Sequence, residues 1–276
     1  MFPSTVLRPW RSDLRSTLRY LLQTEAHVYA LAIAASVLLS FYPFLTVMLS
    51  FCRNVLHWRA AEAAIYLALD DFLPGDVATF IKGNLPSVRA VPATSMVLLL
   101  FTANGVFEPL EVAFNRAWGV ARNRPYWKNQ LVALGLIFAC GGLALLSFLL
   151  TALNTGWLGQ PGGPLSALQN WINLLLFKLA ALPISILALF LVYWLLPNRK
   201  IEPARVAPVA ILVGLLLEAM KYLNLLVFPL LHDKIRREYG VFRNSVTILI
   251  WSFVASLVVL AGAEWSARRE PQDPES

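Results

Sequence analysis

Two runs of twenty-five residues, 27–51 and 129–153, contain no acidic or basic residue apart from His27. About 20 apolar residues are enough for a helix to cross the ~30 Å hydrocarbon core of a bilayer. The whole chain is 58% hydrophobic and only 14% charged, with a mean hydropathy of +0.63, which lies outside the usage of soluble domains. The sequence therefore predicts an all-α, polytopic membrane protein.

The hydropathy pattern predicts one helical bundle of six transmembrane helices over residues 27–267. The expected spans are about 27–51, 93–107, 129–153, 171–196, 204–231 and 244–267. Between the first two spans, residues 60–73 and 76–85 alternate apolar and charged side chains around Pro74-Gly75. We expect these two segments to form short amphipathic helices on the outer face.

The two ends of the chain have a different character. Within residues 1–26, Leu and Trp side chains cluster on one side of a helix and Arg8, Arg11, Arg15 and Arg19 on the other. This pattern is typical of a helix lying on an anionic membrane surface, and the alternative is a solvated helix packed on the bundle. The polar tail 268–276, which contains two prolines, is expected to be disordered and cytoplasmic.

The first span carries a strip of small residues, because Ala26, Ala30 and Ala34 recur at every fourth position. Residues four apart lie on the same face of a helix, so this strip predicts a surface on which another helix packs closely. Pro43 follows near the outer end of the same span. A proline inside a helix removes one backbone donor, and a kink is expected there.

A stripe of polar side chains follows the second span into a charged helix. Asn104, Glu108, Glu111, Asn115 and Trp118 are spaced by four, three, four and three residues, which places them on one helical face. Lipid does not tolerate such a stripe, so it is expected to face other helices or a hydrated cavity. Gly119 is then the expected cap at the end of this helix.

The fifth span contains two charged residues near its middle, Glu218 and Lys221. Their spacing allows an ion pair within one helix turn. Each charge alone would cost about 2.5–3.5 kcal/mol at the centre of a membrane helix. We therefore expect the two side chains to pair and to face a polar neighbour, and Gly214, one turn earlier, leaves space for another group to approach.

Basic residues give the orientation. The segments that would share a side with both termini contain more Lys and Arg than the opposite segments, so both termini are expected in the cytoplasm. The exception is the segment 232–243, expected to be an outer loop, which holds the basic cluster Lys234, Arg236 and Arg237. The formal net charge is +7, but the basic residues flank apolar runs. Binding to anionic lipid headgroups is expected from this distribution, and binding to nucleic acid is not.

Several short motifs resemble the YihY/BrkB family of bacterial inner-membrane proteins, the virulence factor BrkB family, which was once mislabelled ribonuclease BN. The similarity extends over about residues 15–267 and rests on Phe41-Tyr42-Pro43, Glu111 to Gly119 with Asn115 and Trp118, Arg124-Pro125-Tyr126-Trp127, Leu196-Pro197-Asn198-Arg199-Lys200, Glu218 with Lys221 and Tyr222, Tyr239-Gly240, Trp251 and Gly262-Ala263-Glu264. The resemblance implies six spans, cytoplasmic termini and residence in the inner membrane.

Two functions from different classes are compatible with these residues. The first is a transporter or flippase-like protein for an amphiphilic or anionic envelope molecule, with a path lined by Glu218, Lys221, Asn104, Glu108, Glu111 and Asn115 and with Lys234, Arg236 and Arg237 at its outer end. The alternative is a structural or scaffold protein of the envelope, in which the same charges hold helices together. The sequence shows no metal-ligand spacing or nucleophile motif, so neither an enzyme nor a cofactor is expected.

Overall fold

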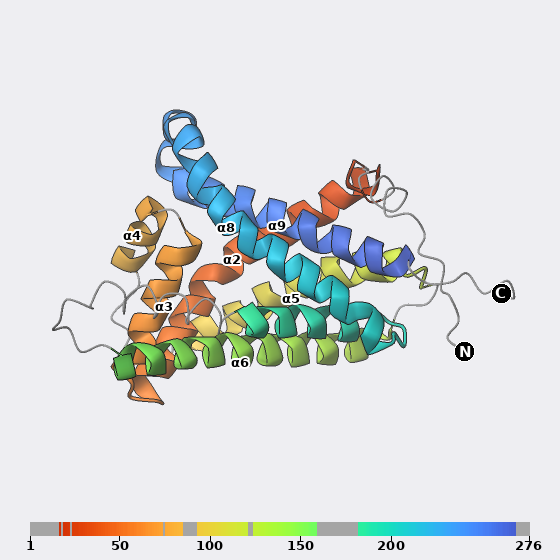
Figure 1. Cartoon of the computed structure of the whole chain (residues 1–276), viewed down its shortest axis with the longest axis horizontal. Helices are drawn as coiled ribbons and strands as arrows, with labels where there is room; N and C mark the ends of the chain where they lie inside the picture. The colour runs from red at the N-terminus through yellow and green to blue at the C-terminus, as the bar shows by residue number, and fades with distance from the viewer. Residues whose placement is uncertain are drawn as a thin grey trace, which may run out of the picture.

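The computed structural model describes residues 17, 19–22, 24–73, 75–84, 93–120, 124–158 and 182–268, and helices are the only regular secondary structure within these ranges (Figure 1). The elements are α2 (Thr24–Asn54), α3 (Arg59–Phe72), α4 (Gly75–Asn84), α5 (Ala93–Ala117), α6 (Tyr126–Leu158), the helix Leu182–Leu195, α8 (Pro203–Tyr239), the short 3-10 helix η1 (Gly240–Phe242) and α9 (Arg243–Arg268). The all-helical class predicted from the sequence is confirmed for the described residues.

Four helical stretches in the described residues are long and apolar enough to cross a membrane. They are Glu25–Asn54, Trp127–Ser147, Pro203–Asn224 and Asp233–Arg268. The expected spans 93–107 and 171–196 correspond to α5 and, in part, to the shorter apolar helix Leu182–Leu195. Residues 171–181, the tail 269–276 and most of the expected amphipathic helix at 1–26 lie outside the described residues.

The helices run between two ends of the bundle. At one end, which we call the inner end, α2 begins, α5 and α9 end, and the segment 196–202 joins the helix Leu182–Leu195 to α8 (Figure 1). An ion pair of 2.8 Å between Arg116 and Glu25 joins the end of α5 to the start of α2. The opposite, outer end holds α3, α4 and the turn between α8 and α9 (Figure 1).

The alanine strip of α2 forms a helix contact, as predicted. Ala26, Ala30 and Ala34 are completely buried, and α2 packs on both α5 and α9. On the α5 side, a Cβ atom added to Gly105 would lie 2.9 Å from the Oγ atom of Ser36. Small residues on both helices therefore allow a close approach, which is how membrane helices pack in the absence of a hydrophobic driving force between them.

Two glycines bring the helix Leu182–Leu195, α8 and α9 together. A Cβ atom at Gly214 of α8 would lie 2.7 Å from Ile186, and one at Gly262 of α9 would lie 2.5 Å from the hydroxyl of Tyr193. That hydroxyl donates a hydrogen bond of 2.8 Å to the carbonyl of Val259. The helix Leu182–Leu195 thus packs closely against Gly214, as expected, and the side chain that contacts this glycine is the apolar Ile186.

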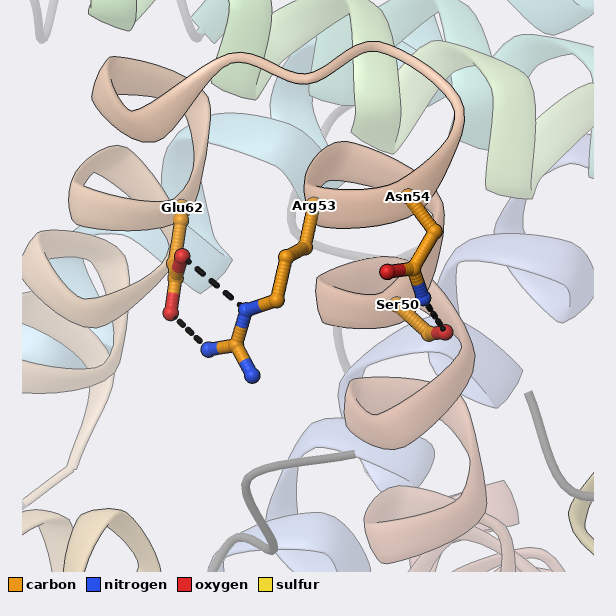
Figure 2. A network of polar contacts seen from close by, with 4 residues as sticks. All are labelled: Ser50, Arg53, Asn54 and Glu62. Carbon is orange, nitrogen blue, oxygen red and sulfur yellow. Dashed lines mark hydrogen bonds and ion pairs between the residues drawn. The ribbon is translucent and has the colours of Figure 1, made fainter. Parts of the chain in front are cut away.

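The two outer amphipathic helices predicted at 60–73 and 76–85 are present as α3 and α4. At the corner between α2 and α3, both ends of the Arg53 guanidinium group bond the carboxylate of Glu62, with 3.3 Å between Nε and Oε2 (Figure 2). Beside it, the Asn54 amide donates to the Ser50 hydroxyl at 2.8 Å (Figure 2). These contacts fix the turn that connects α2 to α3 at the outer end.

The prediction of an outer loop at 232–243 is wrong for most of this segment, because α8 continues as a helix to Tyr239. The charged residues after 231 end the apolar run, but they are good helix formers and do not end the helix. Gly240 ends it, with φ of +51° and its N–H bonded to the carbonyl of Arg236. The basic cluster therefore lies on the last turns of a helix.

Candidate functional site

The end of α5 is shaped by Gly119, as the sequence predicted. Gly119 has φ of +62°, a backbone conformation that residues other than glycine rarely adopt. Its N–H bonds the carbonyl of Arg116 at 3.1 Å, and the N–H of Val120 bonds the carbonyl of Asn115 at 2.8 Å. This pair of bonds is a Schellman motif. It ends α5 and turns the chain toward Arg124.

Asn115 connects α5 to the segment that follows the helix Leu182–Leu195. Its Oδ1 atom accepts a hydrogen bond of 2.7 Å from the backbone N–H of Asn198, and its Nδ2 atom lies 3.4 Å from Oε1 of Glu111. Arg199 adds a bond of 3.3 Å to the carbonyl of Trp118. Four residues of the family-like motifs, Asn115, Trp118, Asn198 and Arg199, are therefore brought together at the inner end.

Arg124 completes this arrangement. Its Nε atom donates to Oδ1 of Asn198 at 3.0 Å, and its two terminal nitrogens donate to the carbonyls of Leu195, Leu196 and Pro197 at 2.9–3.4 Å. The last carbonyls of a helix have no partner within the helix and carry partial negative charge. Arg124 supplies both the donors and the positive charge. We call the group of Glu111, Asn115, Arg124, Asn129 and Asn198 the inner clamp.

Glu111 is the buried carboxyl group of the inner clamp. It is buried and lies beyond residue 107, where the apolar part of α5 was expected to end. Burial raises the pKa of its carboxyl group above the ordinary value, whereas a hydrogen bond from Asn129 and the charge of Arg124 lower it by a smaller amount. The Oδ1 atom of Asn129 is buried without a hydrogen-bond partner in the described part of the chain. The inner clamp thus holds one incompletely satisfied amide next to a carboxyl group whose pKa is raised by burial.

The predicted polar stripe is buried only over its inner part. Glu111, Asn115 and Trp118 are buried, Asn104 is half-buried, and Glu108 is exposed. The partners of Asn115 and Trp118 lie on the segment 196–199, which joins the helix Leu182–Leu195 to α8, so this part of the stripe contacts protein.

The predicted pair on the fifth span is present. Nζ of Lys221 lies 2.7 Å from Oε2 of Glu218, and the side chains are 15% and 25% exposed, respectively. One turn further along α8, Asn224 is buried, and its Oδ1 atom has no hydrogen-bond partner in the described residues. Three polar side chains thus follow one another on a helix whose other residues in this region are mostly apolar. We call them the α8 polar group.

The inner clamp and the α8 polar group lie at different heights in the bundle. Asn198 precedes the start of α8 at Pro203, and Glu218 follows that start by fifteen residues. At 1.5 Å per residue this is ~22 Å along the helix. Part of the intervening core is formed by Phe114 and Tyr193, which are fully buried and stack with ring centroids 5.2 Å apart.

The remaining predicted residues are distributed over the bundle. Lys234, Arg236 and Arg237 are exposed at the outer end, with Tyr239 and Gly240 just beyond them. Glu264 lies near the inner end of α9 and accepts a bond of 2.7 Å from Nε of Arg268. Pro43 is buried inside α2. Within the described ranges, no group of three or more His, Cys, Asp or Glu side chains could hold a metal ion.

Sequence reasoning missed the roles of Arg124, Asn129, Tyr193 and Asn224. In the sequence, Arg124 is notable only as part of the family-like motif that begins at Arg124-Pro125, because its partners lie about seventy residues further along the chain. Asn224 carried a usable signal, since a lone amide in an apolar run, one turn after a charged pair, is costly in a membrane.

Together, the long apolar helices and the polar groups between them define a multi-pass helical membrane protein. A family model described as virulence factor BrkB matches residues 17–276. The chain therefore belongs to the BrkB family, in agreement with the resemblance noted from its motifs.

Several curated relatives are similar over most of this chain. A UPF0761 membrane protein of Chromohalobacter salexigens is 26% identical over 96% of this chain and 66% of its own length. One from Pseudomonas aeruginosa is 26% identical over 85% of this chain and 57% of its own length, and one from Acinetobacter baylyi is 24% identical over 94% and 62%. This chain thus spans about two thirds or less of these relatives. No solved structure matches it.

Proposed function

We propose that this protein is a transporter or flippase-like protein of the bacterial inner membrane that moves an amphiphilic, anionic envelope molecule. The observation that supports this proposal is the α8 polar group, Glu218, Lys221 and Asn224. On the insertion scale each charge costs about 2.5–3.5 kcal/mol at a helix centre, whereas a pair within one helix contributes only about 0.2–0.5 kcal/mol. The pair within α8 therefore offsets only a small part of this cost, and a role in binding would account for the presence of the two charges.

In this proposal the side chains have distinct roles. The Lys221 ammonium group contacts the anionic group of the substrate, and Glu218 holds Lys221 in place or carries a proton. Both side chains are neither fully buried nor freely exposed, so small movements of the neighbouring helices would open them to a ligand. Asn224 offers an amide carbonyl that has no partner among the described residues, next to the same site. No enzymatic step and no cofactor is part of the proposal.

The topology proposed with this function has six spans and two cytoplasmic termini. It adds α5, and the helix that ends at Leu195, to the four long apolar stretches. Cysteines introduced at Lys200 and Arg59 test it, because both positions are exposed and lie at opposite ends of the bundle. In intact cells of a strain with a permeabilised outer membrane, a membrane-impermeant maleimide should label position 59 and leave position 200 unlabelled. The reverse pattern would show that the protein has the opposite orientation in the membrane.

A flippase assay with two labelled lipids tests the proposed function. The purified chain is reconstituted into liposomes with NBD-labelled phosphatidylglycerol or NBD-labelled phosphatidylcholine, and dithionite reports how much probe reaches the outer leaflet. We expect faster movement of the anionic probe than of the zwitterionic one. Glu218→Leu and Lys221→Leu should both abolish this difference while the protein stays folded.

A matched control exists on the same helix. Glu202 and Arg205 form another pair spaced by three residues, 3.3 Å apart, at the inner start of α8 and well before Glu218. Glu202→Leu and Arg205→Leu should leave lipid movement unchanged. If the Glu218 and Lys221 variants also move the anionic probe like the parent, or if the parent moves neither probe, the proposal is wrong.

The inner clamp favours a second candidate, a structural protein of the envelope. Asn115, Arg124 and Asn198 are occupied by bonds between segments, which is the behaviour expected of polar residues that fix helix packing. In this case a charge-swapped variant, Glu218→Lys with Lys221→Glu, should fold and function like the parent. Normal folding with lost lipid movement would favour the transporter.

A further inference from the structure

The turn between α8 and α9 has an unusual surface for its position. It lies beyond residue 231, where charged side chains end the apolar run of α8, and yet the side chains at its apex are apolar. Val241 is 91% exposed and Phe242 is 69% exposed. Both lie in η1, which has no buried residue. We call the segment Lys234 to Arg243 the hairpin tip.

Basic side chains surround this apolar apex. Arg236 and Arg237 are exposed on the last turn of α8, Lys234 is exposed one turn earlier, and Arg243 begins α9 directly after Phe242. The only acidic residue in the hairpin tip is Glu238. An exposed apolar apex with a positive rim is complementary to a bilayer surface that contains anionic lipids, where aromatic and aliphatic side chains enter the interface and cations bind phosphates.

The position of the hairpin tip allows this contact. Figure 1 shows the α8–α9 turn at the outer end of the molecule, projecting away from α6. α8 has 37 residues and is therefore ~55 Å long, more than the ~30 Å hydrocarbon core requires. The helix runs obliquely across the bundle in Figure 1, so its excess length carries the tip sideways as well as outward.

We propose that the hairpin tip is a lipid anchor, in which Val241 and Phe242 enter the outer-leaflet interface and Arg236, Arg237, Arg243 and Lys234 bind the phosphates of anionic phospholipids. Gly240 makes this possible, because its positive φ ends α8 and directs the next two side chains away from the bundle. The anchor is independent of the proposed transport function. It would hold the outer end of α8, the helix that also carries Glu218 and Lys221.

A fluorescent probe at the apex tests the proposal. Val241→Cys is introduced into the full chain after Cys52→Ala and Cys140→Ala, labelled with NBD, and placed in nanodiscs of phosphatidylcholine alone or with about one third phosphatidylglycerol. Nanodiscs expose both faces to aqueous quenchers. In the anionic nanodiscs we expect a blue-shifted emission, strong quenching by lipids with a spin label high on the acyl chain, and at least threefold weaker quenching by iodide than at Lys200→Cys, an exposed control at the inner end.

The charged rim is tested by Arg236→Gln, Arg237→Gln and Arg243→Gln together, with Lys200→Gln as the control for lost charge. In anionic nanodiscs the triple variant should increase the quenching of the apex probe by iodide. Its quenching should then be the same in both lipid compositions. Folding is checked by elution profile and circular dichroism.

Three results would each overturn the lipid anchor. In the first, iodide quenches the apex probe as strongly as the control probe, which places the tip in water. In the second, neither iodide nor spin-labelled lipid reaches the probe, which places it against protein. In the third, the triple variant behaves like the parent, which shows that the three arginines do not bind anionic lipid. None of these readouts depends on lipid movement, so failure here is distinguishable from failure of the transport proposal.

Discussion

Replacing Arg124 with alanine should loosen the inner end of the bundle, because this one side chain bonds the carbonyl of Leu195, where the helix Leu182–Leu195 ends, and the two carbonyls that follow it. Two of its bonds have ordinary lengths, 2.9 Å to the carbonyl of Pro197 and 3.0 Å to Oδ1 of Asn198. The bonds to Leu195 and Leu196 are longer, at 3.2–3.4 Å, and share the same two nitrogens.

The two shorter bonds give the magnitude of the effect. A hydrogen bond to a charged group contributes about 1.5–3 kcal/mol, and the low end applies to a guanidinium that is only half-buried. Two such bonds give about 3 kcal/mol, and the favourable position of a cation at a helix C-terminus adds about 0.3–1 kcal/mol. For a chain of this size, this corresponds to a loss of about 5–10 °C in the apparent melting temperature.

The assay is thermal unfolding in detergent, followed by intrinsic tryptophan fluorescence at one fixed heating rate, since unfolding of membrane proteins is often irreversible. Arg124→Lys should lose roughly half as much as Arg124→Ala, because a point charge cannot bond Asn198 and several carbonyls at once. Lys200→Ala, an exposed cation in the neighbouring segment, is the matched control and should shift by less than about 1 °C. Equal shifts for Arg124→Ala and Lys200→Ala would refute the assigned role of Arg124.

Three further outcomes are expected from the packing and from the buried carboxyl group. Gly262→Ala should cost about 1–3 kcal/mol, since its new Cβ atom would lie 2.5 Å from the Tyr193 hydroxyl, and the loss should be smaller in a Tyr193→Phe background when both are compared by thermal unfolding. Ala30→Leu should cost a similar ~1–3 kcal/mol at its fully buried position, whereas Val28→Leu, at an exposed position on the same helix, should be neutral in the same measurement. Burial raises the pKa of Glu111 above 4.5, so its contribution to stability is greatest below that pH and falls as the pH rises through the folded-state pKa. Glu111→Gln should therefore flatten the pH dependence of the melting temperature. An unchanged pH dependence would contradict this role.

Features that depend on neighbours in sequence could be predicted from the sequence. The apolar runs predicted α2, α6, α8 and α9, because the thickness of a bilayer imposes a minimum length on each of them. The burial of Ala30 and the cap at Gly119 followed from helical spacing and from the conformational freedom of glycine. The pair Glu218–Lys221 likewise needs only one helix turn to form.

Features that depend on distant segments could not be predicted. Nothing near Arg124 in sequence indicates that its partners are Pro197 and Asn198. The close fit of Tyr193 against Gly262 likewise requires knowledge of how α9 lies against the helix Leu182–Leu195. The length of α8 was missed for another reason: the change from apolar to charged residues after 231 marks the end of a span, whereas only Gly240 marks the end of the helix.

This distinction bears on how the family motifs are interpreted. Trp118, Gly119, Pro197 and Asn198 meet at the inner clamp, where caps and hydrogen bonds between segments give each of them a structural reason to be present. Glu218 and Lys221 differ, because their mutual bond lies within one helix and offsets only a small part of the cost of placing two charges in a membrane. Substitutions in the inner clamp should therefore lower stability and activity together. A loss of activity at unchanged stability is expected only from the α8 polar group, and that pattern separates a transport site from a structural one.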